Sequence, residues 1–169
     1  MVLRVMQMRI QLTRDEEFIC HEAAIHLAKQ NTDYWQTREG GYSKEKTLHD
    51  LIAQDAESIG SEWVVAKYLE LPFDPFEQKG KRKADVGANF EVRWTKYDGG
   101  QLIVHEYDRP NDLVILVTGK SPRYFIAGWI PVAVAQKPRY RSSSQPNWWV
   151  SQINLRPIEN LRKTDNGQN

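Results

Sequence analysis

Residues 112–118, with the sequence DLVILVT, restrict the fold of this chain more than any other segment. Five consecutive apolar residues in a segment of strand length are typical of a central strand that is buried on both faces. Both faces of such a strand must be kept from water, and its edges need hydrogen-bonding partners. The run therefore predicts a strand that lies inside a sheet, between other strands.

Other segments with strand character lie on both sides of this run, at residues 6–12, 89–96, 101–105, 123–130 and 148–153. Asp98, Gly99 and Gly100 form a turn signal between the second and third of these segments. We therefore expect residues 89–96 and 101–105 to pair as a hairpin. The Pro- and Ser-rich residues 136–147 are expected to form a loop.

Two helices are expected before most of these strands. Residues 15–30 begin with three acidic residues, which favour the positive end of a helix dipole. Residues 47–69 form the second helix, with an expected break at Gly60 and Ser61, where the serine is a candidate cap for a second segment. Pro72 ends the helical region.

The 169 residues are 40% hydrophobic and 27% charged, which is typical of a globular chain that buries a core. We expect one domain, made of an N-terminal helical extension (1–55), a core (56–130) and a basic C-terminal part (131–169). The single cysteine, Cys20, excludes an internal disulfide and suits a reducing compartment. The sequence has no signal peptide and no membrane-spanning run, so we expect a cytoplasmic protein without a membrane partner.

The net charge is only +1, but its distribution is uneven. Residues 1–78 contain 8 Lys/Arg and 14 Asp/Glu, residues 79–169 contain 15 and 8, and residues 113–158 contain no acidic residue. A basic surface interleaved with aromatic residues such as Tyr124 and Trp148 suits a polyanion with bases that stack. The alternative is a solvated basic face with the aromatic residues in the core. The candidate nucleic-acid contacts are Lys79, Lys81, Arg82, Lys137, Arg139, Arg141 and Trp148.

The strand at residues 89–96 carries the candidate site. Glu91 and Arg93 share one face of it, because residues i and i+2 of a strand point the same way. The opposite face takes the apolar side chains Phe90, Val92 and Trp94. If Asp85 lies on the preceding strand or turn, its carboxylate can meet Glu91 and form a hard-oxygen pocket for Mg²⁺, with the Arg93 cation beside it for a phosphate.

Glu62, in the second helix, belongs to a stripe with Val65, Ala66 and Leu69 that normally faces the core. A carboxylate there needs a partner, so one interpretation is that Glu62 points into the pocket formed by the strands. The alternative is that Glu62 stands in the first turn of a separate helical segment and favours its dipole.

The order of these features resembles the core of the PD-(D/E)xK nuclease superfamily over residues 56–118: a helix with an inward glutamate, an aspartate at a strand start, Glu-x-Arg on a hairpin, and a buried strand. The later stretches LVTG, FIAGWI and WWVSQINLRPIENL resemble small nuclease-like proteins of phages and prophages. The resemblance implies a restriction-endonuclease-like α/β fold, with a mixed central sheet flanked by helices and an N-terminal helical extension.

The resemblance also implies roles for single residues. Asp85 and Glu91 would be metal ligands, the Val92 carbonyl would be a further one, and Glu62 would contact the metal through water or orient the attacking water. The cofactor would be Mg²⁺ or Mn²⁺, and the reaction would be the hydrolysis of phosphodiester bonds in DNA.

Arg93 stands where the superfamily has a lysine. Arginine cannot act as a base, but it can hold a phosphate bidentately. Lys83, two residues before Asp85, is a candidate for the missing lysine.

The resemblance leaves RNA open as a substrate and a homodimer open as the assembly. Two other functions stay open. One is a catalytically inactive nuclease fold that binds nucleic acid, which is favoured by Arg93 in place of lysine. The other is a phage-encoded protein that engages a host enzyme through its acidic N-terminal half.

Overall fold

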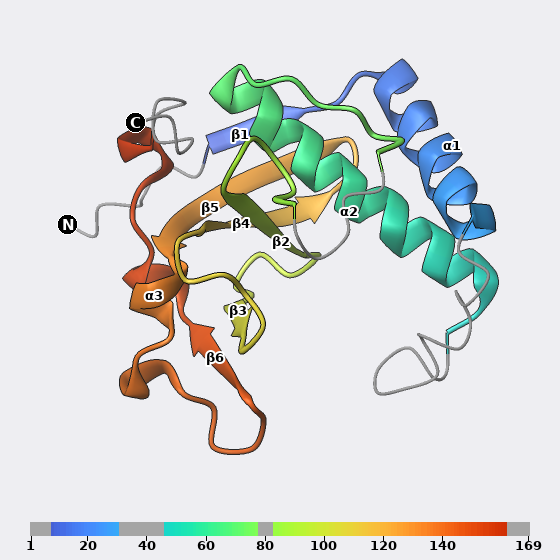
Figure 1. Ribbon diagram of the computed structural model, residues 1–169. Coiled ribbons are helices and arrows are strands. Elements are labelled where there is room, and N and C mark those ends of the chain that lie inside the picture. The colour runs from blue at the N-terminus through green and yellow to red at the C-terminus, as the bar shows by residue number, and fades with distance from the viewer. Residues whose placement is uncertain (1–7, 31–45, 78–82, 162–169) are drawn as a thin grey trace.

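The computed structural model describes residues 8–30, 46–77 and 83–161. It is a mixed α/β structure in which a four-stranded sheet is covered by helices (Figure 1). The sheet has the order β1 (Met8–Gln11), β5 (Arg123–Pro131), β4 (Leu113–Lys120) and β2 (Phe90–Thr95). β2 is parallel to β4, whereas β5 is antiparallel to β4 and to β1. The sheet is therefore mixed in orientation, as predicted.

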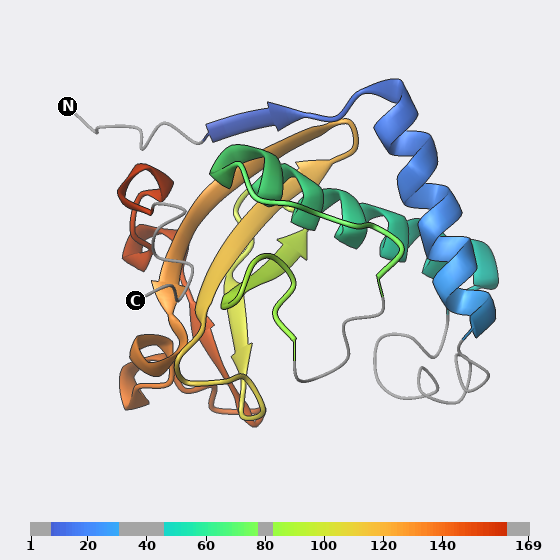
Figure 2. The ribbon, with the colours of Figure 1, turned by 45° about the horizontal axis from the view of Figure 1, so that its top comes forward.

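Two long helices, α1 (Arg14–Gln30) and α2 (Leu48–Leu69), confirm the helical predictions. α2 crosses one face of the sheet, and α1 packs against α2 (Figure 2). α2 begins at a capping box, in which the Thr47 hydroxyl accepts from the Asp50 amide and the Asp50 carboxylate accepts from the Thr47 amide, both at 3.2 Å.

The predicted break at Gly60 and Ser61 is wrong, because α2 is continuous through both residues. The Ser61 hydroxyl donates to the Ser58 carbonyl at 2.6 Å, so it is satisfied inside the helix and caps nothing. Gly60 lies against Tyr124, and a Cβ at this position would come within 2.5 Å of the Tyr124 hydroxyl. Close packing, and not a change of backbone direction, therefore explains this glycine.

β4 is buried on both faces, as the apolar run predicted. Ile115 and Val117 pack in a core with α1 and α2, whereas Val114 and Leu116 pack in a second core on the opposite face of the sheet. This second core contains residues of β3 (Leu102–His105), α3 (Val132–Ala135) and β6 (Asn147–Val150).

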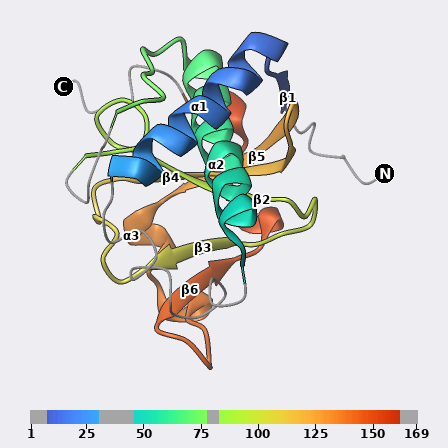
Figure 3. The same ribbon diagram turned by 90° about the vertical axis from the view of Figure 1, so that its right-hand side faces the viewer.

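The predicted hairpin of residues 89–96 with 101–105 is wrong. β3 pairs with β6 in a separate two-stranded sheet below the main one (Figure 3). One edge of β2 is taken by β4, and the other carries a bridge between Phe90 and Val86, so neither edge receives β3. Leu102 and Val104 are buried instead in the second core.

The predicted loop at residues 136–147 contains a short 3-10 helix, Pro138–Tyr140. Two further 3-10 helices, Gln152–Asn154 and Ile158–Asn160, follow β6. Within the described ranges, no helix combines the length and the apolar character needed to cross a membrane.

Candidate functional site

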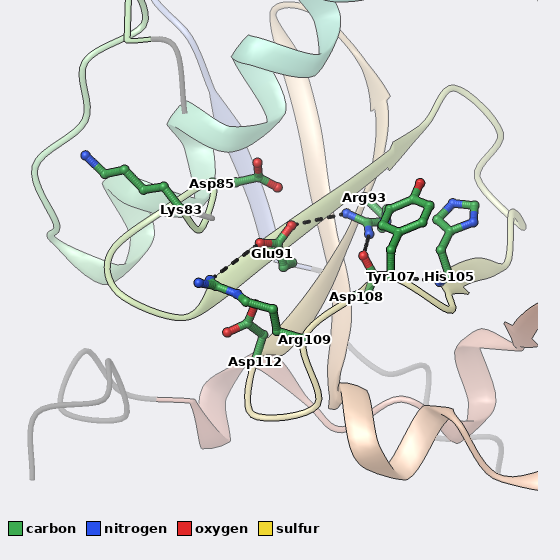
Figure 4. A pocket seen from close by; sticks show the side chains of 9 residues that line it. All are labelled: Lys83, Asp85, Glu91, Arg93, His105, Tyr107, Asp108, Arg109 and Asp112. Carbon is green, nitrogen blue, oxygen red and sulfur yellow. Dashed lines mark hydrogen bonds and ion pairs between the residues drawn. The ribbon is translucent and has the colours of Figure 1, made fainter. Parts of the chain in front are cut away.

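A cavity of about 230 Å³ opens beside β2, on the face where Glu91 and Arg93 lie (Figure 4). Its walls come from the segment before β2, from β2 itself, and from the loop between β3 and β4. Four carboxylates face two guanidinium groups and one ammonium around it. The lining residues are Lys83, Asp85, Glu91, Arg93, His105, Tyr107, Asp108, Arg109 and Asp112.

Asp85 is fixed by a narrow turn that leads into β2. Val86 and Phe90 exchange two backbone hydrogen bonds of 3.0 and 3.2 Å, and the Asp85 carboxylate accepts from the Val92 amide at 2.8 Å. These bonds use the outer edge of β2, away from β4. The Val92 carbonyl lies on that same edge, because a strand residue directs its N–H and C=O to one side. An Asp85 oxygen and the Val92 carbonyl therefore lie on the same edge of β2, and their role as metal ligands stays a prediction.

Glu91 has its side chain 16% exposed and lies among other acids. Burial, followed by the negative charge of Asp85, raises the pKa of Glu91 from 4.5 to about 7. Arg93 opposes this shift, whereas Asp112 and Asp108 add to it. Asp85 and Glu91 therefore repel each other in one cavity, as the sequence suggested, and a divalent cation would relieve that repulsion.

Arg93 is held by two carboxylates. Its Nη2 atom lies 2.6 Å from Asp108 Oδ1, and its Nη1 atom lies 3.5 Å from Glu91 Oε2. Burial would lower the pKa of Arg93, but the charge of Asp108 and its hydrogen bond raise it above the ordinary value. The guanidinium therefore stays protonated and is oriented by Asp108.

Of the charged residues that line this cavity, the sequence predictions missed three: Asp108, Arg109 and Asp112. Asp108 is buried, and besides Arg93 it accepts from the His105 amide at 2.8 Å. Asp112 is also buried and accepts from Arg109 Nε at 2.7 Å, while Arg109 Nη2 lies 4.0 Å from Glu91. The signal in the sequence was a pair of aspartates close to the start of the apolar run.

Glu62 lies half-buried beside a second cavity of about 390 Å³, which it lines with Asp55, Asp85 and Arg93. Asp85 and Arg93 line both cavities, whereas Glu62 lines only the second cavity and Glu91 only the first. Because α2 is continuous, Glu62 stands in mid-helix, and the alternative of a first-turn position is wrong.

Lys83 lines the main cavity, but its ammonium group pairs with Glu77. Figure 4 shows its side chain extending away from Glu91 and Arg93. His105, at the other side of the cavity, has its pKa lowered by burial and then by the Arg93 charge.

The predicted nucleic-acid contacts divide into two groups. Lys137, Arg139 and Arg141 are exposed near the 3-10 helix that precedes β6. Arg141 stacks over the Trp148 ring at 4.5 Å and pairs with Glu106 at 3.0 Å, and Arg139 lies 4.4 Å from the Tyr140 ring centre. Lys79, Lys81 and Arg82 lie outside the described residues. Tyr124 is fully buried, so its assignment to an exposed stacking surface is wrong.

Asp85, Glu91 and the Val92 carbonyl offer oxygen atoms, the type of donor that Mg²⁺ takes in proteins. Among the described residues, no group of three or more His, Cys, Asp or Glu is placed to hold a metal ion. Mg²⁺ is commonly bound through one or two carboxylates and keeps several waters. Asp85, Glu91 and the Val92 carbonyl could supply such a partial shell.

Comparison of the chain with protein-family models, curated proteins and solved structures gives no match. The geometry of this site is therefore the basis for the function of the protein.

Proposed function

We propose that the protein is a metal-dependent phosphodiester hydrolase that cleaves nucleic acid, with DNA as the expected substrate. One observation carries the proposal: the partly buried Glu91 shares an open cavity with Asp85, and the Arg93 guanidinium lies next to Glu91. A carboxylate pair with a neighbouring fixed cation is what a metal ion and a phosphate require together.

Asp85 and Glu91 would hold Mg²⁺ or Mn²⁺, with the Val92 carbonyl as a further ligand. Such an ion lowers the pKa of a bound water and offsets negative charge on the phosphate. The Val92 amide keeps Asp85 in place through its hydrogen bond. Glu62 would accept a hydrogen bond from the attacking water, since it shares a cavity with Asp85 and Arg93.

Arg93 would bind the phosphate of the substrate. Its guanidinium has five N–H donors. Glu91 pairs with Nη1 and Asp108 pairs with Nη2, so the remaining N–H donors of Arg93 can bind a phosphate in the cavity. Lys83 would come next to the phosphate only after leaving Glu77.

A restriction-endonuclease-like arrangement is part of the proposal. It is supported by the mixed sheet and by α2 across one face of it. It is also supported by the order of Asp85, just before β2, and Glu91 and Arg93, within β2. A hydrolase of nucleic acid would act in the cytoplasm, or in the host cytoplasm if a phage encodes it.

A second candidate is an inactive module that binds nucleic acid without cleaving it. The pairing of Arg93 with Asp108 and Glu91 favours it, because the cation is already neutralised by the protein. Such a module needs no metal, so calorimetric titration with Mg²⁺ separates the two candidates.

The proposed hydrolase is tested by incubating the protein with Mg²⁺ or Mn²⁺ and a panel of supercoiled, single-stranded and branched DNAs, with RNA as a further arm. We expect cleavage that EDTA abolishes. Asp85→Asn and Glu91→Gln should each lose it, whereas Asp98→Asn, a control on an exposed turn, should keep it. Full activity in either site variant would reject the assignment.

A further inference from the structure

Two aromatic rings form one side of the main cavity, opposite Lys83 (Figure 4). His105, at the end of β3, stacks on Tyr107 with ring centroids 4.9 Å apart and planes inclined by 7°. Tyr107 is nevertheless 73% exposed. A tyrosine ordered by stacking on one neighbour, and otherwise open to solvent, offers a flat apolar surface at little cost in conformational entropy.

The position of Tyr107 distinguishes it from other exposed aromatic residues. Among the described residues, it is the one large exposed aromatic side chain that lines the cavity with Asp85 and Glu91. Those that do not line it are Phe18, Phe76, Tyr97 and Trp149. Trp148, expected from the sequence to stack on bases, already carries Arg141 over its ring.

The size of the cavity limits what it can hold. At about 230 Å³ it is smaller than the roughly 300–1,000 Å³ of pockets for drug-sized ligands, so it suits part of one nucleotide and not a double helix. A phosphate beside Arg93 would leave the attached base near the mouth, where Tyr107 lies, because both residues line the same small space.

We infer that Tyr107 stacks on a nucleobase next to the phosphate bound in this cavity, and that the substrate is unpaired at that nucleotide. The inference rests on the proposed function. Inside a duplex both faces of a base are covered by its neighbours, so a side chain reaches a face only when the base is single-stranded or turned out of the helix. The substrate would therefore be a single strand, or a flap, loop or bulge.

The test measures binding with Ca²⁺ in place of Mg²⁺, by fluorescence anisotropy. The probes are a labelled oligothymidine of twelve nucleotides, a base-free strand of the same length, a duplex, and an oligouridine. The proteins are wild type, Tyr107→Ala, Tyr107→Phe and Tyr97→Ala. Tyr97 is a matched control, since it is 65% exposed but lies at the turn after β2, outside the cavity lining.

We expect Tyr107→Ala to bind oligothymidine about 5- to 150-fold more weakly, the usual effect of losing one stacked base, and to bind the base-free strand and the duplex as wild type does. Tyr107→Phe and Tyr97→Ala should bind oligothymidine normally. The oligouridine arm decides between DNA and RNA. An equal loss on the base-free strand, or no loss on oligothymidine, overturns the inference.

Cleavage in Mg²⁺ separates this inference from the proposed function. If wild type cleaves DNA and Tyr107→Ala binds oligothymidine normally, the hydrolase stands and the stacking site fails. Base-dependent binding that needs Tyr107, without cleavage of any substrate, would keep the stacking site and reject the hydrolase. If wild type neither binds nor cleaves nucleic acid, both are rejected.

Discussion

Replacing Glu91 by glutamine should make the protein more stable at neutral and alkaline pH. The substitution keeps the size of the side chain and one acceptor oxygen, but it removes a negative charge from among Asp85, Asp108 and Asp112. The ion pairs that it sacrifices, with Arg93 at 3.5 Å and Arg109 at 4.0 Å, are both long. The free energy gained by removing the unfavourable Glu91 charge should therefore exceed the free energy lost with these two ion pairs.

The size and sign follow from the pKa of Glu91. A rise in the pKa from 4.5 to about 7 amounts to at most about 3.5 kcal/mol, since each pKa unit is worth about 1.4 kcal/mol. The folded protein binds this proton more tightly than the unfolded chain, so stability falls as the pH rises from 4.5 through about 7. Because water in the open cavity screens the repulsion, we expect a gain of about 1–3 kcal/mol in the variant above that range, and none below it.

The free energy of unfolding is measured by urea titration with tryptophan fluorescence, at several pH values between about 4 and 8.5. Glu106→Gln is the control, since its side chain is 60% exposed and its loss should change stability by less than about 0.5 kcal/mol. Millimolar Mg²⁺ should stabilise wild type but not Glu91→Gln. Equal stability of the two proteins at high pH, or a difference that persists at the acidic end, would refute the reasoning.

Three further substitutions or modifications test other parts of the structure. Gly60→Ala should destabilise the protein by about 1–3 kcal/mol in urea titrations, although alanine favours helices, and Tyr124→Phe in the same chain should restore part of the loss. Asp108→Ala should lower the free energy of unfolding by about 2–4 kcal/mol, because it leaves the Arg93 guanidinium without its main partner. A decrease below about 0.5 kcal/mol would mean that the ion pair is not maintained in solution. Cys20 is 3% exposed, and burial raises its pKa to about 12. Its thiol should therefore resist iodoacetamide in the folded protein and react fully in urea. Rapid alkylation of the native protein would contradict the packing of α1.

The local parts of the fold could be predicted from the sequence. The apolar run predicted that β4 lies inside the sheet. The alternation at residues 90–94 predicted that Glu91 and Arg93 lie on one face of β2 and the apolar side chains on the other. Both depend on the period of a strand, which a short segment contains in full.

The choice of partners could not be predicted in the same way. The turn at Asp98 suggested a hairpin, but β3 pairs with β6, whose residues come more than forty positions later. Which strand pairs with which depends on how two apolar cores close around β4, and no local signal contains that information. The same holds for Asp108 and Asp112, which belong to the site only because the β3–β4 loop returns to β2.

During synthesis, β1 leaves the ribosome long before the strand that completes it. Met8 pairs with Ile126, so β1 has no pairing partner until more than a hundred further residues have been synthesised. By contrast, α1 and α2 can pack together once residue 69 has emerged. Until β2 and the later strands of the sheet have emerged, the apolar side of this helix pair has no sheet to cover it, and exposed apolar surface of this kind promotes aggregation. Slow translation beyond residue 70 should therefore increase aggregation more than slow translation before it.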